Sequence, residues 1–87
     1  MIITLEGKND IVNALKNNLV DTDRYVCLIA NDNSVVIKPT VTTKGRDTFV
    51  LIKLTAEEVK DIEALFPKRM HVREITFRDE NFQPWGN

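Results

Sequence analysis

The chain is poor in the residues on which small catalytic, metal-binding and disulfide-rich domains depend. Among its 87 residues are one cysteine, one histidine, one tryptophan and three glycines. A lone cysteine excludes a disulfide within the chain and a zinc site built from cysteines. The glycines do not have the spacing of a phosphate-binding loop. A net charge of −1, from 12 basic and 13 acidic side chains, directs the chain to no class of partner.

Long hydrophobic runs are also missing. No run approaches the ~20 apolar residues of a membrane-spanning helix, and residues 1–6 turn acidic too early for a signal peptide. A small fold without disulfides is typical of a reducing compartment, so we expect a cytoplasmic protein that does not enter the membrane. The length allows one domain, which we assign to residues 1–80, with residues 81–87 as a C-terminal tail.

Apolar periodicity and turn residues predict seven elements in the order β-α-β-β-β-α-β. Strands are expected at residues 2–5, 24–30, 35–43, 48–54 and 72–78, with helices at 10–19 and between 55 and 67. The second helix has the clearest start, because Thr55 and Glu58 have the spacing of a capping box. The order predicts an α+β two-layer sandwich, in which a mainly antiparallel sheet carries both helices on one face.

The middle third of the chain predicts two unlike sheet faces. A tight turn centred on Asp32 and Asn33 would pair Ala30 with Val35. In that register one face is wholly apolar and is expected beneath the helices: Val26, Leu28, Ala30, Val35, Ile37, Val41, Val50, Ile52 and Leu54. The other face is mixed and is expected to be exposed: Tyr25, Cys27, Ile29, Val36, Lys38, Thr40, Thr42, Phe49, Leu51 and Lys53.

The mixed face leads to our main functional hypothesis. It carries more apolar surface than a monomer normally exposes in one patch, so we expect it to bind another protein, or a second copy as a homodimer. The C-terminal tail either completes the core over this face or anchors the partner. The expected protein-binding residues are Tyr25, Ile29, Val36, Phe49, Leu51, Phe82 and Trp85. Such a chain suits an inhibitor, adaptor or regulatory protein, of a kind that phages and mobile elements often encode.

Basic and aromatic residues on the same face leave a second hypothesis open, the binding of single-stranded nucleic acid. Tyr25 and Phe49 would stack on bases, while lysines and arginines contact phosphates. The expected phosphate-binding residues are Lys38, Lys53, Lys68, Arg69 and Arg73. Such binding would weaken steeply with salt.

No residue set indicates catalysis, a metal or a cofactor. Cys27 lies in the middle of an apolar strand, where a cysteine acts as a small core residue rather than a nucleophile. His71 has no partners at metal-ligand spacing. The acidic residues at the start of the second helix complement its dipole on a solvated face. We therefore expect a protein that is not an enzyme.

Overall fold

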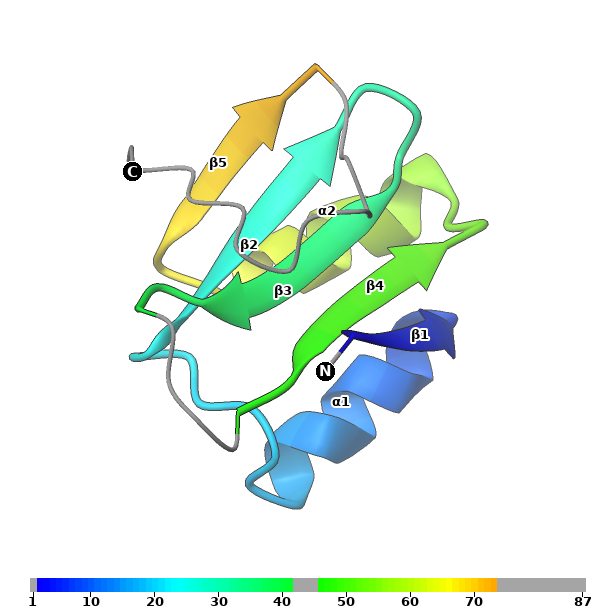
Figure 1. Ribbon diagram of the computed structural model, residues 1–87. Helices are drawn as coiled ribbons and strands as arrows, with labels where there is room; N and C mark the ends of the chain where they lie inside the picture. Colours follow the sequence, from blue (N-terminus) through cyan, green and yellow to red (C-terminus); the bar gives the residue numbers. More distant parts are fainter. Residues whose placement is uncertain (1, 42–45, 74–87) are drawn as a thin grey trace.

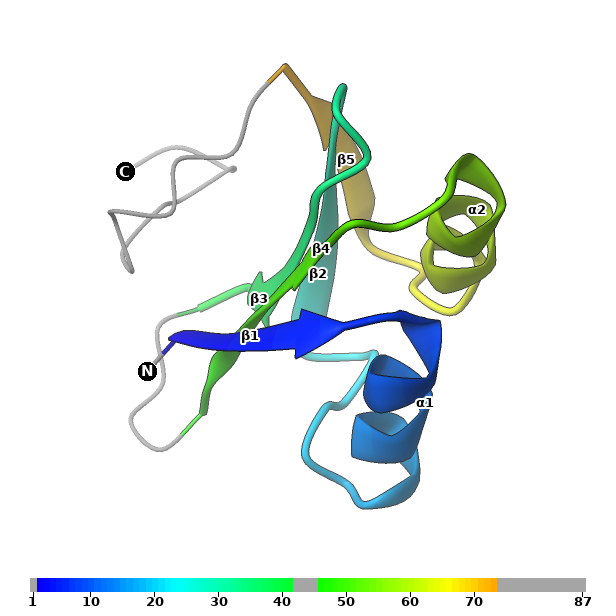
Figure 2. The same cartoon turned by 90° about the vertical axis from the view of Figure 1, so that its right-hand side faces the viewer.

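The computed structural model describes residues 2–41 and 46–73. Five strands form one sheet in the order β1-β4-β3-β2-β5 (Figure 1), and both helices lie on the same side of it (Figure 2). The elements are β1 Ile2–Glu6, α1 Lys8–Lys16, β2 Tyr25–Ala30, β3 Val35–Pro39, β4 Thr48–Ile52, α2 Ala56–Ala64 and β5 Arg69–Val72. The α+β class, the element order and the two-layer arrangement are thereby confirmed.

The sheet combines antiparallel and parallel pairs. The inner pairs, β2 with β3 and β3 with β4, are antiparallel, whereas the outer pairs, β1 with β4 and β2 with β5, are parallel. Each parallel pair joins strands that are distant in sequence, because a parallel pair needs a long crossover. In the part of the chain that the structure describes, the two edges of the sheet are therefore β1 and β5. Neither described helix is long and apolar enough to cross a membrane.

Helix α2 begins with the predicted capping box. The Thr55 hydroxyl accepts from the Glu58 amide, and the Glu58 carboxylate accepts from the Thr55 amide, both at 3.1 Å. Two otherwise unsatisfied amide groups at the helix start are thus bonded. The Lys8 ammonium group bonds the Asp61 carboxylate at 3.1 Å and links the two helices.

The predicted register of β2 and β3 is wrong by one residue. Val35 pairs with Ile29 rather than with Ala30. The connection is a three-residue loop, residues 31–33, and not a two-residue turn. The Asn33 amide donates to the Ala30 carbonyl at 3.1 Å, and the Ala30 amide donates to the Ser34 carbonyl at 2.9 Å. Asn33 has φ 67°, the left-handed conformation that closes this class of hairpin.

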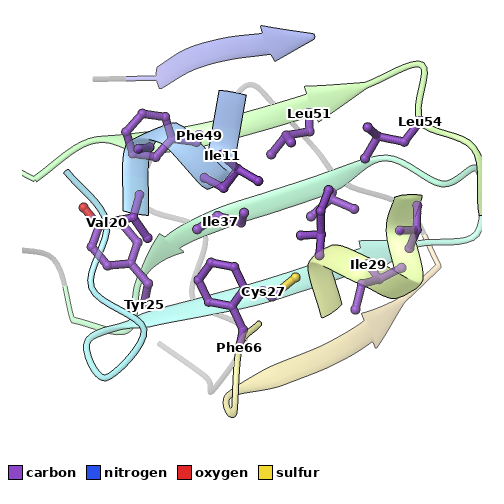
Figure 3. Packing of buried hydrophobic residues seen from close by; sticks show 14 residues of the cluster. Ile11, Val20, Tyr25, Cys27, Ile29, Ile37, Phe49, Leu51, Leu54 and Phe66 are labelled. Carbon is purple, nitrogen blue, oxygen red and sulfur yellow. The ribbon is translucent and has the colours of Figure 1, made fainter. Parts of the chain in front are cut away.

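This shift exchanges the faces of β2, because side chains alternate along a strand. Tyr25 and Ile29 of β2 were expected on an exposed face, but they lie beneath the helices. Phe49 and Leu51 of β4 were expected there too, but they also lie beneath the helices, because β4 pairs Phe49 with Ile37 and Leu51 with Val35. All four are at most 4 % exposed. The core on the helix side is shown in Figure 3. Its buried residues are Ile11, Ala14, Val20, Tyr25, Cys27, Ile29, Val35, Ile37, Phe49, Leu51, Leu54, Val59, Ile62 and Phe66.

Two strands also differ in length or position from the prediction. β3 ends at Pro39 rather than at residue 43, and Val41 is exposed instead of buried, because proline cannot donate to a sheet ladder. The last strand among the described residues is Arg69–Val72, which begins three residues before the predicted start at Val72. Residues 74–78, the expected tail at residues 81–87, Phe82 and Trp85 lie outside the described residues.

Candidate functional site

The sheet face opposite the helices, here called the second face, has its own apolar cluster. Its residues are Val26, Leu28, Val36 and Val50, all buried, with Ile2, Ile52 and Met70 packed around them and partly buried. Neither helix covers this face (Figure 2). Of the predicted protein-binding residues with described positions, only Val36 lies here, and it too is buried. The second face is therefore not an open apolar patch.

The fold separates two of the predicted phosphate-binding residues, Lys38 and Lys53, from the other three at β5. Lys38 lies on the second face, opposite Val26, and is only 4 % exposed. Lys53 is exposed just after β4, and two strands, β3 and β2, lie between β4 and β5 in the sheet. Because Tyr25 and Phe49 are buried beneath the helices, no base can stack on either ring. The proposed aromatic platform is absent among these residues.

Several basic residues do gather at β5. Lys68, Arg69, His71 and Arg73 are exposed. The side chains of Arg69 and His71 point to the helix side, where both meet Glu63 of α2. Met70 packs on the second face, and strand alternation places Val72 with it. β5 therefore presents basic residues on one side and half-buried apolar residues on the other.

Two of the basic side chains of β5 also hold the strand against α2. The Arg69 guanidinium donates to the Glu63 carbonyl at 3.2 Å and lies 3.7 Å from the Glu63 carboxylate. It bonds the Phe66 carbonyl as well, at 3.5 Å. A cation at this position stabilises the carbonyl groups at a helix C-terminus. His71 Nε2 lies 3.7 Å from the same Glu63 carboxylate, while the imidazole stays mostly exposed.

Within residues 2–41 and 46–73, β5 pairs only with β2, so one edge of its backbone has no neighbouring strand there and is called the open edge. The Cys27 amide donates to the Lys68 carbonyl at 2.9 Å. Because peptide groups alternate in direction along a strand, this bond directs the amides of Arg69 and His71 away from β2. Outward peptide groups of this kind are ready to pair with an additional strand.

Cys27 has no features of a reactive thiol. It is fully buried, as its position in an apolar strand predicted, but it lies in the helix-side core and not on the mixed face to which the sequence analysis assigned it. Burial raises the pKa of its thiol to about 12, and the Glu63 charge adds to the shift. A nucleophilic cysteine needs a lowered pKa and access to solvent. Within residues 2–41 and 46–73, no three histidine, cysteine, aspartate or glutamate residues gather as a metal site.

Other surface features offer little chemistry. A hollow of about 190 Å³ is lined by Arg24, Pro39, Thr40, Val41 and Arg46. The Arg46 guanidinium lies 5.8 Å from the centre of the Tyr25 ring, a cation–π contact that closes the core at this end.

Sequence reasoning identified part of the β5 surface. Lys68, Arg69 and Arg73 were predicted as phosphate-binding residues, and the structure places all three at the β5 edge of the sheet. Met70 and the position of β5 at an edge were not predicted, because the last strand was expected to start at Val72. The alternation of charged and apolar residues from Arg69 to Val72 is the signal that could have found the strand.

No family model matches this chain, and the searches of curated proteins and of solved structures likewise find no match.

Proposed function

We propose that this chain is a small non-enzymatic protein-binding module, an inhibitor, adaptor or regulatory protein, that binds a strand of its partner along β5. The observation that carries the proposal is the open edge of β5 with its basic side chains. An extended partner segment would bond to the outward peptide groups at Arg69 and His71. In the reducing cytoplasm, the proposed location, Cys27 stays a free thiol.

Charge favours an acidic partner. Exposed sheet edges commonly carry charged residues that discourage the addition of a further strand. Here the charged residues of the strand and its ends, Lys68, Arg69 and Arg73, are all positive. Glu63 of α2 lies beside Arg69 and lowers the net charge there, but the edge as a whole still repels basic segments and attracts acidic ones. A partner strand with acidic residues on the helix side would face Arg69 and His71. Apolar residues on its other side would extend the contact toward Met70. The proposed binding surface at β5 is therefore mixed apolar and basic, like the sheet face predicted from the sequence, but it lies at the edge of the sheet.

The same charges disfavour a homodimer through β5. In an antiparallel pair of two identical strands centred on His71, Arg69 of one copy would lie opposite Arg73 of the other. Like charges directly opposite each other destabilise a strand pair. We therefore propose a different protein as the partner rather than a second copy. Nucleic-acid binding is the weaker alternative, because the aromatic residues assigned to base stacking are buried.

The first test is a titration of the full-length protein with two short peptides, followed by amide NMR shifts. One peptide alternates Glu and Val, and the other alternates Lys and Val. The proposal predicts saturable shifts at the amides of Arg69 and His71 with the acidic peptide alone. Equal binding of both peptides, or shifts away from β5, would contradict it.

A pair of variants at one position separates backbone pairing from side-chain charge. His71→Pro removes the outward amide, whereas His71→Ala removes the imidazole and keeps the amide. Strand addition predicts that the proline variant loses peptide binding and that the alanine variant retains most of it. Circular dichroism and thermal unfolding establish that both variants are folded. Equal loss in both variants would mean that the imidazole is the contact.

The test in cells is an affinity isolation with the tagged wild-type chain, with His71→Pro and with Leu19→Glu, each with and without nuclease. Leu19 is exposed in the segment after α1, away from β5, and serves as the control position. A partner retained by the wild type and by the Leu19 variant, but lost with His71→Pro, supports the proposal. Material lost on nuclease treatment supports the nucleic-acid alternative.

A further inference from the structure

We propose that β1, at the other edge of the sheet, pairs with β1 of a second copy of this chain and forms a weak homodimer. This inference concerns a surface separate from β5 and does not depend on the proposed partner strand there. Within residues 2–41 and 46–73, β1 pairs only with β4. In Figure 2 the strand lies on the near side of the sheet, with no described helix or strand in front of it.

The backbone of β1 presents peptide groups on its outer side. The Glu6 amide donates to the Asp10 carboxylate at 3.2 Å, so it points away from β4. Because peptide groups alternate in direction along a strand, the amide and carbonyl groups of Ile2 and Thr4 also point away from β4. The Asp10 carboxylate occupies only the last of these outward amides. The groups at Ile2 and Thr4 are therefore placed to bond to an additional strand.

The side chains of β1 do not protect this edge. Ile3 and Leu5 pack against the helix-side core and are only partly buried, while Thr4 is exposed. Glu6, at the end of the strand, is its one charged residue. Free sheet edges commonly carry charged residues that block strand addition, as the basic residues do at β5. Residues 2–5 carry no charge, so β1 is the edge that admits a further strand.

A second copy fits this edge because the strand is complementary to itself. An antiparallel pair centred on Thr4 uses the whole of β1, and the two threonines exchange both backbone hydrogen bonds. Ile3 then lies opposite Leu5 on the helix side. Glu6 lies opposite Ile2 and not opposite the Glu6 of the second copy. Apolar pairs and threonine pairs stabilise paired strands, whereas the corresponding pair at β5 would bring arginines together.

The pairing would join two sheets into one continuous sheet. A twofold axis perpendicular to the sheet relates the two copies, so the helices of both lie on the same side and one β5 lies at each end. The contact consists of two strands of five residues each, and interfaces this small are weak. The dimer therefore forms at high protein concentration and leaves both β5 edges free for a partner.

The first experiment measures the oligomeric state of the full-length protein by sedimentation equilibrium, from ~10 µM to ~1 mM, a range that suits a small interface. The wild type should change from monomer to dimer over this range. Thr4→Lys and Thr4→Glu each place like charges at the centre of the pair, so each variant alone should stay monomeric. An equimolar mixture of the two should dimerise again, because the facing charges are then opposite.

Thr4→Ala is the matched control, since it keeps the outward amide and adds no charge, and it should dimerise like the wild type. Thr4 is exposed, and circular dichroism with thermal unfolding establishes that all three variants are folded. A wild type that stays monomeric up to ~1 mM would overturn the proposal. Dimerisation of Thr4→Lys alone to the same extent as the wild type would also overturn it.

The second experiment needs no variant and follows amide hydrogen exchange of the wild type by NMR at increasing protein concentration. The Thr4 amide should exchange only from the monomer, so its rate should fall about tenfold where about nine-tenths of the chains are paired. The Leu5 amide points to β4 and is the internal control, which should be protected equally at every concentration. Protection of the Thr4 amide at every concentration would overturn the proposal, because the edge would then be covered within one chain. Rapid exchange at every concentration would overturn it as well.

Discussion

The Ala30 amide donates to the Ser34 carbonyl at 2.9 Å and closes a hairpin loop of three residues. This bond sets the pairing of β2 with β3, in which Val35 faces Ile29. Because the loop has three residues and not two, Tyr25, Cys27 and Ile29 point to the helices, and Val26 and Leu28 lie on the second face. The loop therefore determines which residues form the main core and which are left for the sheet's other side.

Asn33 is the residue on which this loop depends, since its φ of 67° is unfavourable for most side chains. Asn33→Gly should leave the free energy of unfolding unchanged or raise it by a few tenths of a kcal/mol, because glycine adopts this conformation without strain. Asn33→Val should lower it by about 1–2 kcal/mol. Urea unfolding of both variants measures the difference. Equal stabilities would mean that the loop changes its conformation.

Lys53 is a second residue in the left-handed region, with φ 59°, at the bend between β4 and α2. It is exposed, so its side chain can be replaced without leaving a cavity. Lys53→Gly should stabilise the protein by about 0.5–1 kcal/mol, since relief of strain exceeds the added entropy of the unfolded chain. Lys53→Ala loses the same charge but keeps the strain, and it should stay near wild type. A gain in both variants would assign the effect to charge instead.

The elements of this fold were predictable because their signals are local. The capping box at Thr55 and the spacing of Val59 and Ile62 define α2 within a few residues. The sheet faces were not predictable, because β2 is apolar at every position and either alternate set could form the core. Periodicity then carries no information on the faces of β2, and the length of the loop at residues 31–33 decides them. The candidate site followed from errors of this kind in both β2 and β4, because Tyr25 and Phe49 were assigned to the wrong side.

The strand order could not be obtained from the sequence either. β1 pairs with β4 and β5 pairs with β2, and both pairs join segments that are distant along the chain. Such pairings depend on how the helices pack against the sheet rather than on a turn motif. The basic residues from Lys68 to Arg73 were visible as a cluster, but their position at an open edge depends on this order.

Cys27 should be inert in the folded protein, because burial raises the pKa of its thiol to about 12 and keeps reagents away. At pH 8 we expect no reaction with a chromogenic disulfide reagent until the protein unfolds, and one thiol equivalent per chain in denaturant. The rate under native conditions should rise in destabilised variants such as Asn33→Val. Rapid reaction of the native wild type would contradict the burial.

Glu58 should make the stability of the protein depend on pH on the acidic side. The Thr55 amide donates to its carboxylate at 3.1 Å, and this bond holds the pKa of Glu58 below its ordinary value of 4.5. The unfolded chain therefore binds this proton more tightly than the folded protein does. The stabilisation of the fold by ionised Glu58 is fully present above pH 4.5 and is lost as pH falls through the folded-state pKa. The loss should therefore appear below pH 4.5, in urea midpoints measured from pH 7 to pH 3.

Glu58→Gln provides the direct comparison, because an amide does not titrate. Its stability should fall less steeply than that of the wild type below pH 4.5, while Thr55→Ala should lower stability by about 1 kcal/mol at neutral pH through loss of the cap. Glu57→Gln is the matched control, since Glu57 lies in the same first turn and takes no part in the capping box. The plot of urea midpoint against pH should be flatter for Glu58→Gln than for the wild type. If it is instead flatter only for Glu57→Gln, the acid sensitivity comes from the helix dipole and not from the capping bond.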